Sequence, residues 1–445
     1  WNKDNQGFYY SRYDQPASDG EALKDSNYNQ KLYYHRMGDA QTADVLVYQR
    51  PDHKEWGFDG RVSEDGRYLV IHVWLGTNRE NGVFYLDLQE GGQVVELLNA
   101  FDAAYTFISN EGSTFYFLTD HNAPNGRVIG IDLNHPTQQS WKEIIPQSPD
   151  ALEQVNLIDR QFAALYHHDA YDRVALYWQD GGFLRDVDLP GMGTVAGFSG
   201  AAADKETFFL FTSFTTPGTV YHYSLESHQC QVFRAPQVDF DPDDYITEQV
   251  FYPSKDGTSI PMFLSYKKGM KRDGSTPTYL YGYGGFNISL TPTFSVSNLV
   301  WMEMGGIYAH AILRGGGEYG KAWHDGGRLR NKQNVFDDFI AAAEWLIAQG
   351  YTSTPRLAIG GRSNGGLLIG ACLTQRPDLF GACLPVVGVL DMLRFHKFTI
   401  GWAWTSDYGS PEEAEDFKTL LAYSPYHNIR PGTAYPPTLI TTGHH

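Results

Sequence analysis

The sequence has few cysteines and no long apolar run. Its 445 residues include only Cys230, Cys372 and Cys383, and no C-x-x-C pair. Three scattered cysteines make neither a disulfide framework nor a cysteine-based metal site, so we expect buried free thiols and no bound metal. No stretch reaches the roughly 18 uninterrupted apolar residues that a membrane-spanning helix requires. We therefore expect a soluble protein without a membrane partner, in the cytoplasm or the periplasm, with the compartment left open.

Positive charge is also scarce. The chain has 34 Lys and Arg against 52 Asp and Glu, which gives a net charge of −18 at pH 7. Such a field repels nucleic acid and anionic membranes, and no basic run interrupts it. We expect no nucleic-acid partner, and we interpret the acidity as an aid to solubility.

Aromatic residues are abundant in the first half, in a pattern typical of β-strands. Up to about residue 236, short aromatic or aliphatic segments alternate with Gly, Asp and Asn turns. The segments "SEDGRYLVIHVW" and "SNEGSTFYFLTD" begin at Ser63 and Ser109, which are 46 residues apart. A repeat of this length is typical of β-propeller blades, and about four to five would fit. A β-sandwich or unrelated meanders are the alternatives.

The second half has a different periodicity. Strand-like segments now alternate with helical ones such as "NVFDDFIAAAEWLIAQG" (334–350), whose apolar residues recur every three to four positions. This alternation predicts a parallel α/β sheet. We therefore divide the chain into an all-β domain, 1–236, and an α/β domain, 237–445, with the boundary near residues 236–245.

A candidate nucleophile lies in "LAIGGRSNGGLLIGACL" (357–373). Gly361-Arg362-Ser363-Asn364-Gly365 matches the G-x-S-x-G elbow, with a predicted strand before it (357–361) and a predicted helix after it (364–375). In such an elbow Ser363 would be the nucleophile, and the backbone N–H of Asn364 would donate to the oxyanion. The alternative is a glycine-rich structural turn.

Three further segments could complete the site. "YLYGYGGFNISLTP" (279–292) could provide the Tyr283 hydroxyl as a second oxyanion donor, although a hairpin with buried aromatics is the alternative. "RGGGEYG" (314–320) lacks a phosphate-binding pattern, and we interpret it as a structural loop at the edge of the site. "GWAWTSDYG" (401–409) could expose Trp402, Trp404 and Tyr408 around an apolar pocket, with core packing as the alternative.

Together these motifs carry a family resemblance. "YGYGGFNIS", "RGGGEYG", "NKQNVFDDF", "GGRSNGGLL", "QRPDLFGA", "GWAWTSDYG" and "YSPYHNI", in this order, resemble the prolyl oligopeptidase family of serine peptidases. The resemblance implies an α/β-hydrolase domain capped by a seven-bladed propeller, partial here. It also implies cleavage of short peptides after proline by a monomer without a cofactor.

The resemblance also implies roles for individual residues. Ser363 would be the nucleophile, and the Tyr283 hydroxyl and Asn364 N–H would form the oxyanion hole. The pocket for proline would be lined by Phe286, Val389, Trp404 and Tyr408. Trp404 would stack on the proline ring, and the Asn364 side chain would hydrogen-bond the peptide. A flat, apolar ring without an N–H suits an aromatic slot.

The sequence departs from the family pattern at three points. Arg362 stands where a glycine is more common, and the early part of the pattern is absent before Trp1. No Asp or His after Ser363 matches the catalytic acid or histidine, which we expect beyond residue 445. His444 and His445 could begin the acid loop or belong to a tag. We expect the chain by itself to be inactive or unstable.

Two other functions stay open. One is a related peptidase with another preference before the scissile bond, similar to oligopeptidase B or acylaminoacyl-peptidase. The other is a propeller scaffold with a catalytically dead hydrolase domain.

Overall fold

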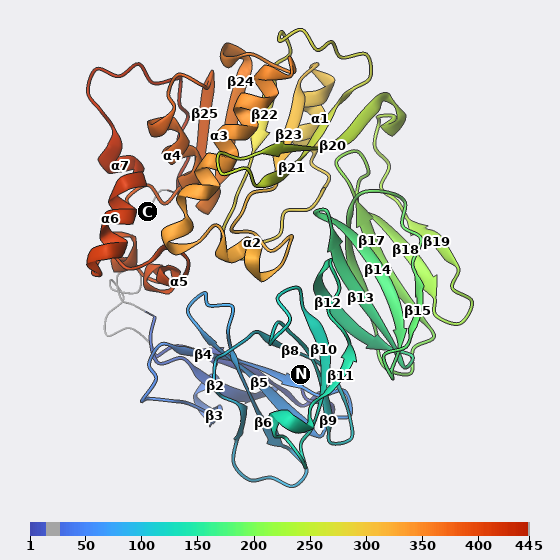
Figure 1. Cartoon of the computed structure of the whole chain (residues 1–445). Coiled ribbons are helices and arrows are strands. Elements are labelled where there is room, and N and C mark those ends of the chain that lie inside the picture. Colours follow the sequence, from blue (N-terminus) through green and yellow to red (C-terminus); the bar gives the residue numbers. More distant parts are fainter. Residues whose placement is uncertain (15–26, 444–445) are drawn as a thin grey trace.

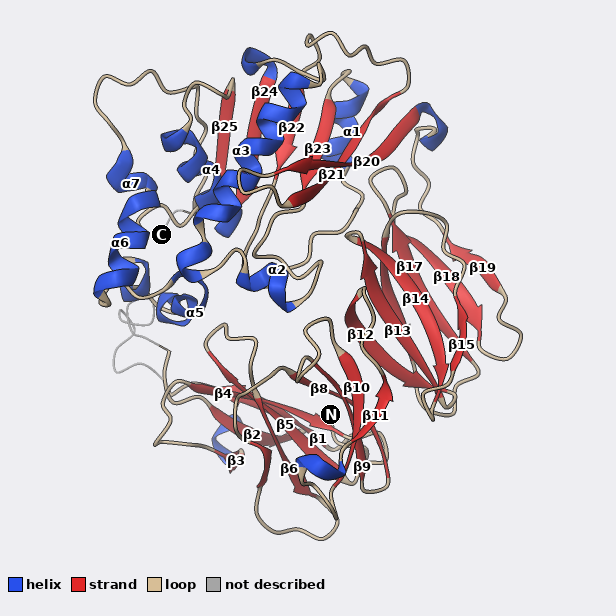
Figure 2. Ribbon diagram, viewed as in Figure 1, coloured by secondary structure: helices blue, strands red, loops and turns tan. Residues whose placement is uncertain are grey.

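The computed structural model describes residues 1–14 and 27–443 (Figure 1). His444 and His445 lie outside the described residues. The first part of the chain forms five antiparallel sheets, and the second part forms one six-stranded sheet with helices (Figure 2). None of the helices in the described ranges is long and apolar enough to span a membrane.

The five antiparallel sheets follow one another along the chain. Their strands are β1 (Gly7–Arg12), β2 (Lys31–Arg36) and β3 (Val45–Tyr48); β4 (Trp56–Val62), β5 (Tyr68–Leu75), β6 (Gly82–Asp87) and β7 (Val95–Leu98); β8 (Tyr105–Glu111), β9 (Thr114–Thr119), β10 (Arg127–Asp132) and β11 (Lys142–Ile145); β12 (Ala151–Ile158), β13 (Gln161–His168), β14 (Tyr171–Trp178) and β15 (Phe183–Asp186); and β16 (Thr194–Ser199), β17 (Glu206–Thr212), β18 (Thr219–Ser224) and β19 (Cys230–Arg234).

Each sheet buries its apolar face against the next one. Phe115 and Phe117 of β9 pack with Tyr68 of β5, and Phe162 of β13 packs with Tyr116 of β9. In the same way Phe209 of β17 packs with Ile158 of β12. Successive antiparallel sheets that each pack face to face on their sequence neighbours are typical of the blades of a propeller. The expectation of blades is confirmed, and the sandwich alternative is wrong.

The six-stranded sheet has the order β20-β21-β23-β22-β24-β25. Its strands are β20 (Tyr245–Pro253), β21 (Ser259–Lys267), β22 (Thr278–Tyr281), β23 (Ile307–Ala311), β24 (Leu357–Arg362) and β25 (Ala382–Val386). The pairs β22–β23, β22–β24 and β24–β25 are parallel. β20 and β21 are antiparallel to each other and β21 to β23, so the predicted parallel pairing does not extend to this edge of the sheet. The short turn between β20 and β21 permits only a hairpin.

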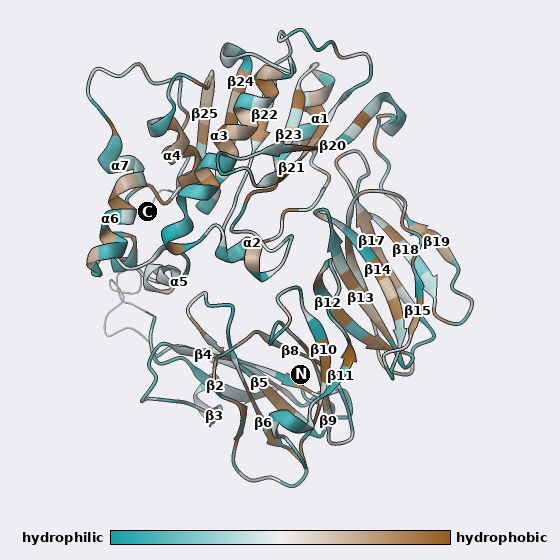
Figure 3. Cartoon of the chain, viewed as in Figure 1, coloured by the Kyte–Doolittle hydropathy of each residue, from teal (hydrophilic) through white to brown (hydrophobic). Residues whose placement is uncertain are grey.

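Helices cover this sheet and carry the segments around the site. They are α1 (Val296–Glu303), α2 (Lys321–Asp325), α3 (Gln333–Ala348), α4 (Asn364–Gln375), α5 (Thr405–Tyr408), α6 (Ala414–Tyr423) and α7 (Pro425–Asn428). Helix α3 buries Val335, Phe339 and Leu346 in the main core, together with Ile359 of β24 and Leu368 of α4. Figure 3 shows apolar residues, in brown, along the strands of this sheet and on the helices beside it.

The cysteines only partly follow expectation. Cys230, Cys372 and Cys383 are all free thiols, but only the last two are buried. Cys230 lies on β19, the outermost strand of its sheet, where all five residues are exposed.

The two halves of the chain contact each other next to α2 (Figure 1). The Lys321 N–H donates to the carbonyl of Pro124 at 2.8 Å. Thr194 donates through Oγ1 to the carbonyl of Pro292 at 2.8 Å. The chain passes from β19 to β20 through residues 235–244, and the boundary at 236 stays a prediction.

Candidate active site

Ser363 occupies a sharp turn between strand β24 and helix α4. Its backbone has φ 57° and ψ −115°, the left-handed region that a residue with a side chain rarely adopts. Such a conformation costs on the order of 1–3 kcal/mol and is held by its surroundings. The Ser363 N–H donates to the Val386 carbonyl at 2.9 Å, and its own carbonyl accepts from Leu367 at 3.1 Å. The side chain is exposed, as the predicted elbow requires.

The flanking glycines are required by close packing. A Cβ at Gly361 would lie 2.4 Å from the carbonyl oxygen of Gly365. A Cβ at Gly365 would lie 2.8 Å from the carbonyl oxygen of Gly282. Gly282 belongs to the neighbouring residues 282–287, which we call the Tyr283 segment. Both distances are too short for a real Cβ, so the elbow needs glycine at both positions.

Tyr283 is in contact with the elbow. Asn364 Nδ2 donates to the Tyr283 carbonyl at 2.7 Å, so the two residues predicted to provide the oxyanion donors are neighbours in space. Burial, followed by the negative charge of Asp407 and the proximity of Tyr281, raises the pKa of the Tyr283 hydroxyl to about 12. This hydroxyl is therefore protonated at neutral pH and can act as a donor.

The Asn364 side chain does not point toward solvent. Asn364 is 1% exposed, and its Oδ1 accepts from Lys332 Nζ at 2.9 Å and from the Tyr408 hydroxyl at 3.0 Å. The side chain turns inward from the first turn of α4, and its expected hydrogen bond to the peptide stays a prediction. Its backbone N–H opens the helix and has no acceptor within it.

A buried pair of opposite charges lies beneath the site. Lys332 and Asp407 are 1% and 2% exposed, with Nζ 3.9 Å from Oδ2. Lys332 also donates to the Gly284 carbonyl at 2.8 Å. Burial lowers the pKa of Lys332 to about 8, and the charge of Asp407 partly offsets that effect. Sequence analysis assigned no role to either residue, although both lie within the quoted motifs.

Asp407 connects to two more groups through its other oxygen. Oδ1 lies 2.9 Å from His324 Nε2 and accepts the Phe286 N–H at 3.1 Å. Phe286 and Asn287 have φ of 58° and 54°, so this carboxylate supports a second strained backbone segment. His324, at the end of α2, was also missed, because neither its spacing nor its flanking residues form a motif.

The apolar and aromatic residues predicted for the proline pocket differ in depth. Phe286, Val389 and Trp404 are half-buried and pack on the rim of the main core. Tyr408 is only 1% exposed, which agrees with the core-packing alternative for this residue and not with an exposed loop. Its ring meets that of Phe286 edge-on, with centroids 5.2 Å apart, and its hydroxyl is committed to Asn364. It supports the pocket residues from behind.

The remaining predicted elements lie close by or elsewhere. The loop 314–320 packs against the Tyr283 segment, with the Asn287 N–H donating to the Gly315 carbonyl at 3.1 Å. His396 pairs with Glu412 at 2.9 Å, and His427 contacts Ser424 at 2.8 Å. Within residues 1–14 and 27–443, no histidine hydrogen-bonds Ser363. The base and acid stay predictions beyond residue 445.

A propeller packed on a hydrolase sheet with a serine elbow defines a propeller-capped α/β hydrolase. A family model described as "Prolyl oligopeptidase, N-terminal beta-propeller domain" matches residues 1–236, and one described as "Prolyl oligopeptidase family" matches residues 292–445. The chain belongs to the prolyl oligopeptidase family.

Similar proteins agree with this assignment. A prolyl endopeptidase of Elizabethkingia miricola is 44% identical over 441 residues, which are 99% of this chain and 62% of the relative. A structure from a study of two prolyl endopeptidases has a TM-score of 0.94 at 42% identity and covers 99% of this chain and 64% of its own. Prolyl oligopeptidase B of Galerina marginata, bound to a 25mer macrocyclization substrate, has a TM-score of 0.94 at 38% identity, with 99% and 62% covered. The chain thus spans somewhat less than two thirds of these relatives.

Proposed function

We propose that this chain carries the nucleophile of a serine peptidase that hydrolyses short peptides on the carboxyl side of proline. The observation that carries the proposal is that Ser363 is exposed at the β24–α4 turn, where its backbone φ is positive. The Asn364 carboxamide joins this turn to the Tyr283 segment. Within the proposal, residues 1–236 form the propeller and 237–445 the hydrolase domain of a monomer.

The proposed reaction is acyl transfer through Ser363. Its Oγ attacks the carbonyl carbon after proline, and the carbonyl oxygen becomes an oxyanion. The Tyr283 hydroxyl and the Asn364 N–H donate to that oxygen, aided by the positive end of α4. The C–N bond then breaks, and the serine proton passes through a histidine base to the leaving amine. Water subsequently hydrolyses the acyl-enzyme.

The proposed preference for proline rests on the apolar rim. Phe286, Val389 and Trp404 offer apolar and aromatic surface without a carboxylate among them. A proline ring is recognised by burial and ring contact, whereas a basic side chain needs a charged partner. The similar proteins named prolyl endopeptidases support the same preference.

The test compares two chromogenic peptides that differ only in proline or arginine before the scissile bond. The complete polypeptide that contains this chain should cleave the proline peptide, and Ser363→Ala should abolish cleavage. Tyr283→Phe should lower kcat/KM by about 10²–10³, as expected for loss of one oxyanion donor. Preference for arginine would indicate the related-peptidase alternative. Failure of a fluorophosphonate to label Ser363 would indicate a dead scaffold.

A further inference from the structure

A chain of buried and partly buried polar contacts joins the propeller to the Tyr283 segment. Arg79 Nη1 lies 3.0 Å from His324 Nδ1, and His324 Nε2 lies 2.9 Å from Asp407 Oδ1. Asp407 Oδ1 in turn accepts the Phe286 N–H at 3.1 Å. We call these four residues the Arg79 relay. Because Arg79 belongs to the propeller and the others to the hydrolase domain, the relay crosses the domain interface.

The donors and acceptors along the relay have a fixed direction. A guanidinium only donates hydrogen bonds, and an ionised carboxylate only accepts them. His324 must therefore accept from Arg79 at Nδ1 and donate to Asp407 at Nε2, which defines the neutral Nε2–H tautomer. His324 is 3% exposed, and both of its ring nitrogens have protein partners. The imidazole is held in a single orientation only while Arg79 is in place.

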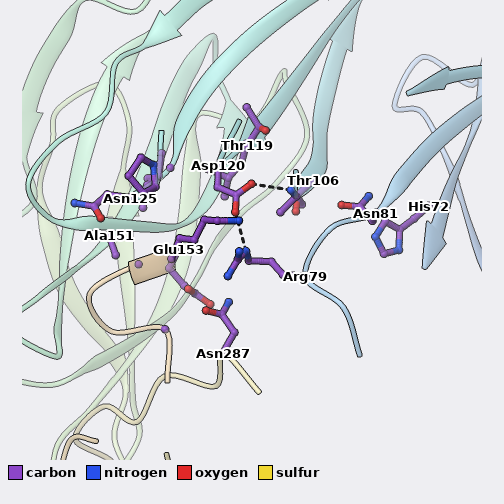
Figure 4. Close-up of a pocket in the computed structure, with 18 residues that line it drawn as sticks. His72, Arg79, Asn81, Thr106, Thr119, Asp120, Asn125, Ala151, Glu153 and Asn287 are labelled. Carbon is purple, nitrogen blue, oxygen red and sulfur yellow. Dashed lines mark hydrogen bonds and ion pairs between the residues drawn. The ribbon is translucent and has the colours of Figure 1, made fainter. Parts of the chain in front are cut away.

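Arg79 is held in place by the propeller. It lies between β5 and β6, and its Nε donates to Asp120 Oδ2 at 2.7 Å. Its side chain is 10% exposed and lines a cavity of about 290 Å³ between the domains, together with Asp120 and Asn287 (Figure 4). The position of the guanidinium relative to His324 therefore depends on the position of the propeller relative to the hydrolase domain.

The same propeller loop also contacts the segment that carries Asp407. Thr77 donates to the Ala403 carbonyl through its N–H at 3.2 Å and through Oγ1 at 2.9 Å. Thr77 Oγ1 also lies 2.7 Å from Ser406 Oγ. Both hydrolase residues are within four positions of Asp407. Withdrawal of the loop would remove support from His324 and from α5 together.

The far end of the relay supports strained backbone. Phe286 and Asn287 both have positive φ, a strained conformation for residues with side chains that persists only where neighbouring groups hold it. Phe286 is three residues after Tyr283, and its N–H donates to Asp407. Loss of the correct Asp407 orientation would therefore let the Tyr283 segment relax.

We propose that Arg79, His324 and Asp407 are positioning residues through which the seated propeller fixes the backbone of the Tyr283 segment in its oxyanion-binding conformation. The effect on oxyanion binding rests on the proposed function, whereas the hydrogen-bonded connection from Arg79 to the Phe286 N–H does not. None of the three needs to contact the peptide, since they act through the Phe286 N–H.

The test measures hydrogen exchange at the Phe286 amide, which requires no peptidase activity. In the 445-residue chain, Arg79→Met should accelerate this exchange about tenfold, the effect of losing one hydrogen bond to a charged group. The matched control is Lys321→Met, which removes another cation from the same interface, paired with Glu80 at 3.3 Å. Lys321→Met should leave the Phe286 amide unchanged. Equal exchange in both variants would overturn the proposal.

A second pair of variants separates positioning from simple packing. His324→Gln keeps one donor and one acceptor, so it should retain most of the protection, while His324→Leu should lose it. Equal loss in both would overturn the proposal. In the complete polypeptide, Arg79→Met should lower kcat more than it raises KM for the proline peptide. If that polypeptide has no activity, the proposed function fails. The exchange result would still show whether Arg79 and His324 hold the Phe286 amide in place.

Discussion

The Asn364 carboxamide donates to the backbone carbonyl of Tyr283 at 2.7 Å, although the two residues are 81 positions apart. This bond joins the segment of one predicted oxyanion donor directly to the other. The carboxamide oxygen simultaneously holds Lys332 and Tyr408. Asn364 is thus the residue on which both halves of the predicted oxyanion hole depend.

Replacing this carboxamide should destabilise the protein strongly. Asn364→Ala removes the acceptor of a buried lysine and leaves the Tyr283 carbonyl without its donor, so we expect a loss of about 2–4 kcal/mol. Urea unfolding followed by tryptophan fluorescence measures it. The matched control, Asn331→Ala, removes an exposed carboxamide bonded to the Asp325 carbonyl and should change stability by about 0.5 kcal/mol or less. Similar losses in both variants would contradict this role.

Lys332 should make the free energy of unfolding depend on pH in the alkaline range. Burial lowers its pKa from 10.5 to about 8, so above pH 8 the unfolded chain binds more protons at this residue than the folded one. Stability should therefore rise with pH in this window, by on the order of 2 kcal/mol up to pH 9.5. The difference between wild type and Lys332→Met isolates this contribution from that of the tyrosines. A pH-independent difference would show that Lys332 titrates normally.

Glu318 should make stability fall, rather than rise, as the pH increases toward neutrality. Its Oε1 accepts the Leu290 N–H at 2.7 Å, and Oε2 has no hydrogen-bond partner in the described part of the chain. Burial, only partly offset by that bond, raises its pKa from 4.5 to about 7. The folded state then binds more protons between these values, so stability falls as pH rises through them.

The matched variant for this effect is Glu318→Gln, which is neutral at every pH. It should match wild type near pH 4.5 and exceed it by on the order of 3 kcal/mol above pH 7. Thermal unfolding across this range measures the difference. A variant that is less stable than wild type at pH 8 would show that the carboxylate has a stabilising partner.

The elbow should not tolerate even one methyl group at Gly361. Its Cβ would collide with the Gly365 carbonyl, so Gly361→Ala should cost about 1–3 kcal/mol. Gly130→Ala is the control, because Gly130 lies in β10 and its Cβ would meet its neighbours only at 3.6 Å. This control should change stability by less than about 1 kcal/mol. Chemical denaturation compares the two, and equal costs would contradict a specific constraint at the elbow.

Local patterns predicted the elements of the fold well. The expected strand 357–361 and helix 364–375 correspond to β24 (Leu357–Arg362) and α4 (Asn364–Gln375). The blade repeat was recognisable because each strand buries alternate residues and each turn needs particular residue types. The antiparallel edge of the six-stranded sheet was missed, because pairing direction depends on how a turn closes rather than on strand composition.

The sequence by itself determined the identity of the elbow and the order of the domains, because both are written in residues close together along the chain. Only the tertiary structure decided where polar side chains point. It turned Asn364 inward, buried Tyr408, and brought Arg79, His324, Lys332 and Asp407 together across more than 320 positions. Burying charge is favourable only when partners from other segments satisfy it, and no local pattern records which segments will meet.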